Sequence, residues 1–253
     1  MKKYLIPILI FISVIIYSND ILAQQKTTIP FPKIDLQVGT AQDGNDVSTT
    51  LQILLLMTVL SLAPSIVIMT TAYLRIIIVF HFLKNALGTQ QMPPSQLLAG
   101  IALFVTFFIM APTWNKVNDD AIKPLMDNKI KVNEAYDKGI EPIRKFMFKN
   151  VREEDLELFV GLSNMERPKN RTELPTYILI PAFVLSELRT GFIIGFFMFI
   201  PFIMVDMIVS SILMSMGMMM MPPMMISLPF KILLFILVDG WNLIIGSLVR
   251  SFH

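Results

Sequence analysis

The sequence contains no cysteine and only two histidines, His81 and His253, among its 253 residues. Disulfide bonds, thiolate chemistry and zinc sites built from His and Cys are therefore excluded. Charged residues are also scarce, and 21 Lys and Arg against 19 Asp and Glu leave a net charge of only +2. Because no basic stripe stands out, we expect no nucleic-acid partner.

The usual signatures of enzymes are missing as well. The sequence has no phosphate-binding G-x-x-x-x-G-K-[ST], no metal-binding H-E-x-x-H, no G-x-S-x-G and no dinucleotide-binding glycine pattern. We therefore expect no enzymatic activity, no cofactor and no metal site.

Apolar residues, by contrast, are abundant. They make up 54% of the chain, and the mean hydropathy is +0.64. This composition is unlike that of a soluble domain. It predicts an all-α protein that is targeted to a membrane and built from hydrophobic helical hairpins.

The N-terminal 50 residues predict two segments. Residues 1–23 carry Lys2 and Lys3, then an apolar stretch, then Ala23, which is typical of a signal peptide. The alternative is an uncleaved first membrane helix. Residues 24–50 are polar with scattered Pro and Gly, and predict an extended leader outside the membrane.

Residues 51–115 predict an N-terminal hydrophobic helical hairpin. The stretch from Leu51 to Thr71 has no charge, and a helix of that length spans about 31 Å, the thickness of a bilayer core. We expect Pro64 to kink it. The second arm has its apolar body at Leu97–Met110, after the helix-breaking pair Pro93-Pro94.

Residues 116–175 form a polar segment that holds 12 acidic and 12 basic residues. Val151–Leu162 predicts a helix, and Pro124, Pro142 and Pro168 predict breaks. The connection 72–96 carries basic but no acidic residues, so the positive-inside rule places it in the cytoplasm. The polar segment then lies on the periplasmic side.

Residues 176–253 are apolar again and contain six acidic or basic residues: Glu187, Arg189, Asp206, Lys231, Asp239 and Arg250. The uncharged blocks between them are short or broken by Pro222-Pro223. Neither block predicts an undisturbed, lipid-facing helix of about 20 residues. We therefore expect these C-terminal helices to pack mainly on other protein.

Methionine is concentrated in one place. Eight of the 19 Met residues lie between Met214 and Met225, around Gly217 and the Pro pair, which predicts a turn between two helices. Core filling is one explanation, because Met adapts to irregular gaps. The other is a pore gasket: a ring of thioethers from several protomers that excludes water and ions. Its candidate residues are Met218, Met219, Met220 and Met221.

The charges in the apolar block are costly unless they are paired, so they mark structural or intersubunit contacts. Glu187 and Arg189 are two residues apart, so on a helix each reaches a different partner, on another helix or another subunit. We expect Glu187 to contact another subunit. Asp206 and Lys231 flank the Met-rich segment and could pair at the base of its hairpin. The alternatives are snorkelling to headgroups and, for Glu187 and Asp206, proton or solute transport.

Gly191 and Gly195 are four residues apart in an apolar stretch. Such a small-xxx-small pattern allows two helices to approach closely, so we expect helix packing at both glycines.

Three stretches resemble one known family. They are Pro181-Ala-Phe-Val-Leu-Ser-Glu-Leu-Arg-Thr-Gly-Phe-Ile-Ile-Gly195, the Met-rich segment with its Pro pair, and Leu228-Pro-Phe-Lys-Ile-Leu-Leu-Phe-Ile-Leu-Val-Asp-Gly-Trp-Asn242. Met69–Phe80 and Gln91–Pro94 are similar to the same family. The chain resembles the FliP family of flagellar biosynthesis proteins over roughly residues 50–252.

This resemblance implies a subunit of the flagellar type III export gate, in the bacterial inner membrane at the flagellar basal body. It implies a homo-oligomeric helical pore with FliQ-like and FliR-like companions, other export membrane proteins, lipid, and unfolded flagellar substrates as partners. The family's Met loop maps onto Met218–Met220, with Met221 contributing, and its functional Glu and Lys map onto Glu187 and Lys231. The gate of a virulence injectisome and a small-solute or proton transporter remain as alternatives.

Overall fold

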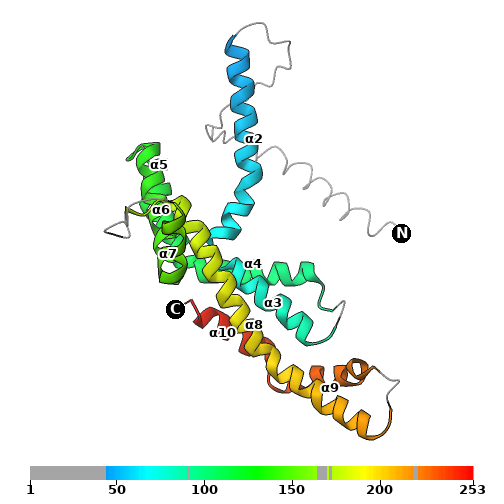
Figure 1. Cartoon of the computed structure of the whole chain (residues 1–253). Coiled ribbons are helices and arrows are strands. Elements are labelled where there is room, and N and C mark those ends of the chain that lie inside the picture. Colours follow the sequence, from blue (N-terminus) through cyan, green and yellow to red (C-terminus); the bar gives the residue numbers. More distant parts are fainter. Residues whose placement is uncertain (1–43, 90–91, 164–169, 171–172, 219–221, 253) are drawn as a thin grey trace, which may run out of the picture. The chain divides into compact units, whose positions relative to one another are not determined.

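The computed structural model describes residues 44–89, 92–163, 170, 173–218 and 222–252. The expected signal peptide and most of the leader lie outside these ranges. The chain divides into two compact units, residues 1–53 and 54–253. Within the described ranges every regular element is a helix, so the predicted all-α fold is confirmed (Figure 1).

Helix α2 spans Gly44–Thr70. Its first residues, 44–50, correct the prediction of an extended leader, because they continue the helix of the apolar stretch. Pro64 lies inside α2 without ending it. The stretch Leu51–Thr70 is apolar all round and leaves nearly all its side chains exposed, which is the pattern of a helix surrounded by lipid or by other protein.

Helix α3 (Tyr73–Ala86) occupies the segment that the sequence analysis treated as a connection. Its buried positions recur every three or four residues, as on one face of a helix. They are Arg75, Ile76, Val79, Phe80, Leu83 and Ala86. Gly88 ends the helix with a φ of +72°, a conformation that favours glycine. Helix α4 (Ser95–Val117) begins directly after Pro94, as predicted.

The polar segment is more continuously helical than its prolines predicted. Helix α4 runs into a π-helical turn, η2 (Asn118–Ile122), and α5 (Lys123–Met126). Helices α6 (Val132–Asn150) and α7 (Glu153–Leu162) follow, the latter close to the predicted range. Pro124 stands in the first turn of α5, where a missing N–H costs little, and Pro142 lies inside α6. Neither proline breaks the chain, and Pro168 lies outside the described residues.

Helix α8 (Thr176–Ser215) is 40 residues long, with Pro181 and Pro201 inside it. At about 1.5 Å per residue it extends roughly 60 Å, about twice the thickness of a bilayer core. Helices α9 (Pro223–Leu237) and α10 (Gly240–Arg250) follow, bent by 62° at their junction. Asp239 makes that bend with a φ of +50°.

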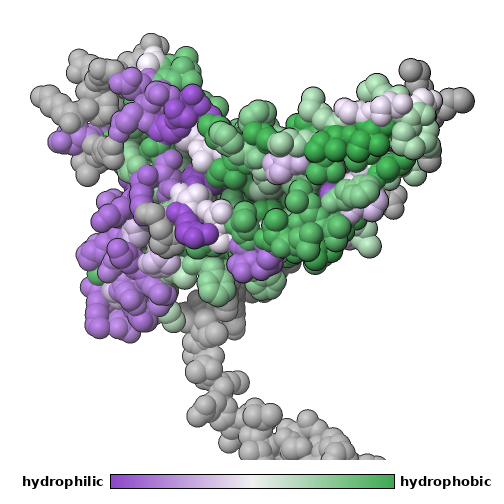
Figure 2. Space-filling view, turned by 90° about the horizontal axis from the view of Figure 1, so that it is seen from below, coloured by the Kyte–Doolittle hydropathy of each residue, from purple (hydrophilic) through white to green (hydrophobic). Residues whose placement is uncertain are grey.

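Helix α8 runs past two hydrophobic cores within residues 54–253. One core joins α3 and α4 to the middle of α8, α9 and α10, and the other joins α6 and α7 to the start of α8. Figure 2 shows hydrophilic residues gathered on the side of α5–α7, and hydrophobic residues covering the side of the α8–α9 hairpin. The polar and apolar segments of the sequence are therefore separate surfaces of the folded chain.

Three described helical stretches are long and apolar enough to cross a membrane: Leu51–Thr70, Ser95–Met126 and Thr176–Ser215. The bent pair α9–α10 makes a fourth if it counts as one span. Large apolar side chains are exposed along all of them, including Phe104, Phe108 and Phe197. Exposed apolar surface on this scale needs lipid or protein to cover it, which indicates a membrane location.

Candidate functional site

The described part of the Met-rich segment ends α8 and begins α9, on either side of residues 219–221. Gly217 has a φ of +74°, and its N–H donates to Met214 O at 3.1 Å, while Met218 N–H donates to Leu213 O at 3.1 Å. These two bonds form a Schellman motif, which stops a helix and reverses the chain. The Pro pair then starts α9, because Pro223 fits its first position. Gly217 and the Pro pair, from which the sequence predicted a turn, stand where α8 ends and where α9 begins.

The described methionines around this turn are exposed in the isolated chain, including Met216, Met218 and Met225. Met219, Met220 and Met221 lie outside the described residues. The exposed ones do not fill the core of their own chain, so they are free to contact another protomer, a companion protein or a lumen.

A polar cluster joins the two arms of this hairpin. Lys231 Nζ on α9 donates to Asp206 Oδ2 on α8 at 2.6 Å, and Ser227 Oγ donates to Asp206 Oδ1 at 2.5 Å. The Lys231 and Ser227 side chains are buried, whereas Asp206 keeps a third of its side chain exposed. The pairing that the sequence analysis allowed for Asp206 and Lys231 is present. Ser227, which that analysis missed, completes the cluster.

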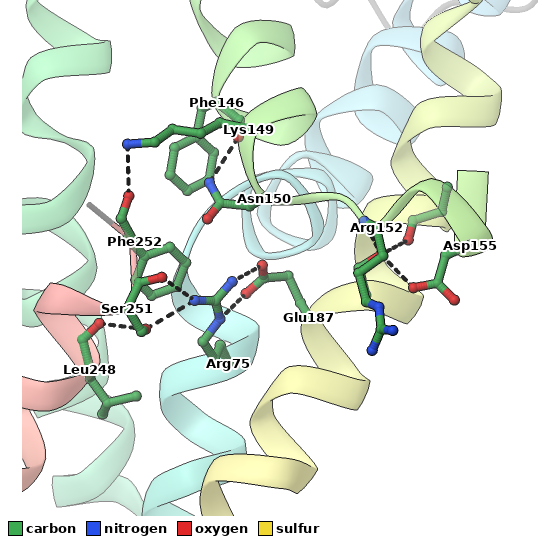
Figure 3. Close-up of polar contacts among 12 residues, drawn as sticks. Arg75, Phe146, Lys149, Asn150, Arg152, Asp155, Glu187, Leu248, Ser251 and Phe252 are labelled. Atoms are coloured by element: carbon green, nitrogen blue, oxygen red, sulfur yellow. Dashed lines mark hydrogen bonds and ion pairs between the residues drawn. The ribbon is translucent and has the colours of Figure 1, made fainter. Parts of the chain in front are cut away.

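A second, fully buried ion pair joins α3 to α8. Arg75 Nε donates to Glu187 Oε2 at 2.8 Å, and Arg75 Nη2 donates to Glu187 Oε1 at 2.5 Å (Figure 3). This is the bidentate geometry that matches guanidinium to carboxylate. Both side chains are at most 3% exposed.

Glu187 therefore finds its partner inside its own chain. The spacing of Glu187 and Arg189 left open whether Glu187 would contact another helix or another subunit, and in the structure it contacts another helix, α3. Its side chain has no exposed part to offer to a second subunit, so we assign it a structural role instead of the expected intersubunit contact. Arg189 points elsewhere, as the spacing predicted, and donates to Glu154 Oε2 on α7 at 3.0 Å.

Ser186, next to Glu187, joins α8 to α7. Its Oγ donates to the buried Asp155 Oδ2 at 2.7 Å and accepts from the N–H of Arg152 at 3.0 Å. Two successive residues of α8 thus connect it to two different helices. Sequence reasoning missed Arg75, Ser186 and Asp155, although a charge on the buried face of a periodic helix, as at Arg75, does require a partner.

Gly191 and Gly195, the two residues for which the sequence predicted close helix packing, face α3. A Cβ added at Gly191 would lie 3.1 Å from Ile78 Cγ2, and one at Gly195 would lie 2.5 Å from Phe82 Cγ. The contact is between α3 and α8 of one chain.

We expect Gly195→Ala to destabilise the protein by about 1–3 kcal/mol, because the new methyl group overpacks this contact. The Phe82 ring cannot simply swing away, since its own Cβ would be 2.9 Å from the added atom. Gly100→Ala is the matched control. It lies in α4 with nothing within 4 Å of an added Cβ, so we expect it to stabilise by about 0.5–1 kcal/mol through backbone entropy. Thermal unfolding of the purified protein in detergent measures both, and equal shifts would contradict this packing.

No group of three or more His, Cys, Asp or Glu side chains that could hold a metal ion occurs among the residues that the structure describes. A groove of about 370 Å³ between α8 and α9 is lined only by apolar side chains, including Val209, Leu213 and Phe230. The site therefore offers a deformable apolar surface on a hairpin whose arms are joined by one ion pair and one serine hydrogen bond.

Comparison with known proteins gives a consistent result. The FliP family model matches residues 56–248. The flagellar biosynthetic protein FliP of Bacillus subtilis is 54% identical over 217 residues, which cover 86% of this chain and 98% of the relative. FliP of Borreliella burgdorferi is 49% identical over 83% of this chain and 84% of its own length, and FliP of Caulobacter vibrioides is 48% identical over 87% and 82%. This chain therefore belongs to the FliP family.

Proposed function

We propose that this protein is a subunit of the flagellar type III export gate, and that its Met-rich turn seals the export pore while unfolded flagellar proteins pass. The observation that carries the proposal is the position of the methionines. The described methionines on either side of residues 219–221, namely Met214, Met216, Met218, Met224 and Met225, are exposed where α8 ends and α9 begins, and they do not fill the core of their own chain.

The physical argument for sealing rests on the side chain itself. Methionine is unbranched and polarizable, so several of them can close a narrow apolar opening, exclude water, and still yield to a passing chain. One turn cannot surround an opening. The proposal therefore requires a homo-oligomer around an axis, with FliQ-like and FliR-like companions.

Family membership and the apolar helices support a place in the bacterial inner membrane, within the flagellar basal body. We keep the prediction that α5–α7 lie on the periplasmic side, and we expect no enzymatic role. The family's relatives carry flagellar names, which favours the flagellar gate over an injectisome gate. The transporter alternative gains no support from Glu187, because that carboxylate is sealed in an ion pair.

Replacing Met218, Met219 and Met220 together with Gly tests the seal. We expect a severalfold increase in ion leakage across the inner membrane, because the side chains that exclude water are gone. The matched control replaces Met204 and Met207, which are also exposed but lie on α8 away from the turn. Unchanged leakage in a correctly assembled complex would refute the sealing role.

A further inference from the structure

The segment Ser251–Phe252 lies where three other helices meet. It follows the last residue of α10 and contacts Arg75 of α3 and Lys149 of α6, and Arg75 in turn pairs with Glu187 of α8 (Figure 3). The Phe252 side chain is buried. Two residues that follow a short helix therefore contact helices that are far from them in the sequence.

Arg75 binds this segment through Nη1, the guanidinium nitrogen that does not donate to Glu187. Its Nη1 donates to Ser251 O at 3.0 Å and to Ser251 Oγ at 2.9 Å. Its guanidinium carbon also lies 3.7 Å from the centre of the Phe252 ring, within cation–π range. One buried guanidinium therefore joins α3, α8 and the end of α10.

Helix α6 also contacts this segment, through one hydrogen bond and one aromatic contact. Lys149 Nζ donates to Phe252 O at 3.1 Å, and the Phe146 ring is stacked on the Phe252 ring with centroids 6.0 Å apart. The carbonyls after the last turn of a helix have no partner within that helix, and its C-terminal end carries partial negative charge. Here the carbonyls are capped by two cations that come from other helices.

We propose that Ser251–Phe252 is a latch that fixes the α9–α10 arm to the rest of the fold. The arm bends by 62° at Asp239, so α9 alone does not determine where α10 lies. Closing the latch holds the end of α10 beside α3 and α6, while the rest of α10 packs on the core that it shares with α3 and α4, and it satisfies the carbonyls at the end of α10. Opening it exposes those carbonyls and leaves Arg75 with Glu187 alone. The latch does not depend on the proposed sealing role.

Because the chain lacks cysteine, two introduced thiols carry spin labels at unique positions. Lys145→Cys on α6 and Leu243→Cys on α10 are both exposed. The labelled full-length protein is mixed with excess unlabelled protein in the assembled complex, so that only distances within one chain contribute. We expect one narrow distance distribution, and with Phe252→Ala a second, longer component that holds at least half of the population.

Arg250→Ala is the matched control, because Arg250 is adjacent and exposed, and the hydrogen bond that it makes within the described residues goes to Gly246 O of its own helix. It should leave the distribution narrow. If Phe252→Ala yields no folded protein, Phe252→Leu keeps apolar bulk but removes the ring from Arg75 and Phe146, and the longer component should still appear. A single narrow distribution in either folded variant would overturn the latch. Ion leakage is not part of this measurement, so failure of the latch and failure of the seal are distinguishable.

Discussion

Glu187→Ala is expected to destabilise the protein by about 3–5 kcal/mol, because it leaves the guanidinium of Arg75 buried without its counter-charge. Arg75 is 3% exposed, so water cannot take the place of the lost carboxylate without opening the packing of α3 against α8. The two contacts to Ser251 remain, but neither brings a negative charge.

Glu154→Ala is the matched control for this prediction. Glu154 also accepts hydrogen bonds from two arginines, Arg152 and Arg189, but its side chain is 68% exposed. Such surface pairs are worth about 0–1 kcal/mol, so this variant should be close to wild type. Thermal unfolding in detergent, with assembly on native gels, compares the two.

A double-mutant cycle separates the pair from its neighbours. We expect Arg75→Met combined with Glu187→Leu to cost less than the sum of the single variants, because removing both charges leaves neither unpaired. Additive costs would mean that the two side chains do not stabilise each other.

The sequence predicted the apolar helices and the Met turn because these depend on local signals. Gly217 and the Pro pair stop and restart helices through backbone geometry alone, and Pro94 sets the start of α4 in the same way. The sequence also predicted close packing at Gly191 and Gly195, because small residues allow two helices to approach. It did not predict that the opposing helix is α3.

Helix α3 was missed although its pattern was present. Ile76, Val79 and Leu83 show the spacing of a helix with one buried face, but the basic residues of the segment, which no acidic residue accompanies, led to its being interpreted as a connection. The buried Arg75 explains how a helix with one buried apolar face can also carry a charge on that face. It carries a charge on the buried face because Glu187 neutralises it from a helix 112 residues later, a contact that no local pattern contains.

For the prolines the error was the reverse: the sequence predicted a break where the structure has a helix. Pro142 predicted a break, but α6 continues through it. A proline inside a helix costs about 3 kcal/mol or more, which tertiary packing can offset. Here Arg144, two residues later, is buried and donates to Leu174 O and Thr176 Oγ1 at the start of α8. Contacts of this kind favour the continuous helix.

Asp206→Ala is expected to destabilise the α8–α9 hairpin more than Lys231→Met does, although both remove the same ion pair. The Lys231 side chain is 4% exposed, and Asp206→Ala removes the carboxylate with which its ammonium pairs, so we expect a cost of about 2–4 kcal/mol. Lys231→Met leaves the Asp206 carboxylate bonded to Ser227 and one-third exposed to water, so about 0–2 kcal/mol is expected.

Lys129→Met is the matched control for the lysine variant, since Lys129 pairs with Asp127 at 2.9 Å but both side chains are more than half exposed. Thermal unfolding in detergent ranks the three variants, and exposure of the turn is measured by labelling a thiol introduced as Met216→Cys. We expect the order Asp206→Ala, Lys231→Met, Lys129→Met, from most to least destabilised. If Lys231→Met were the most destabilising of the three variants, the prediction would be wrong. The buried charge of Lys231 would then not explain how this cluster stabilises the hairpin, and apolar packing alone would have to position the methionines.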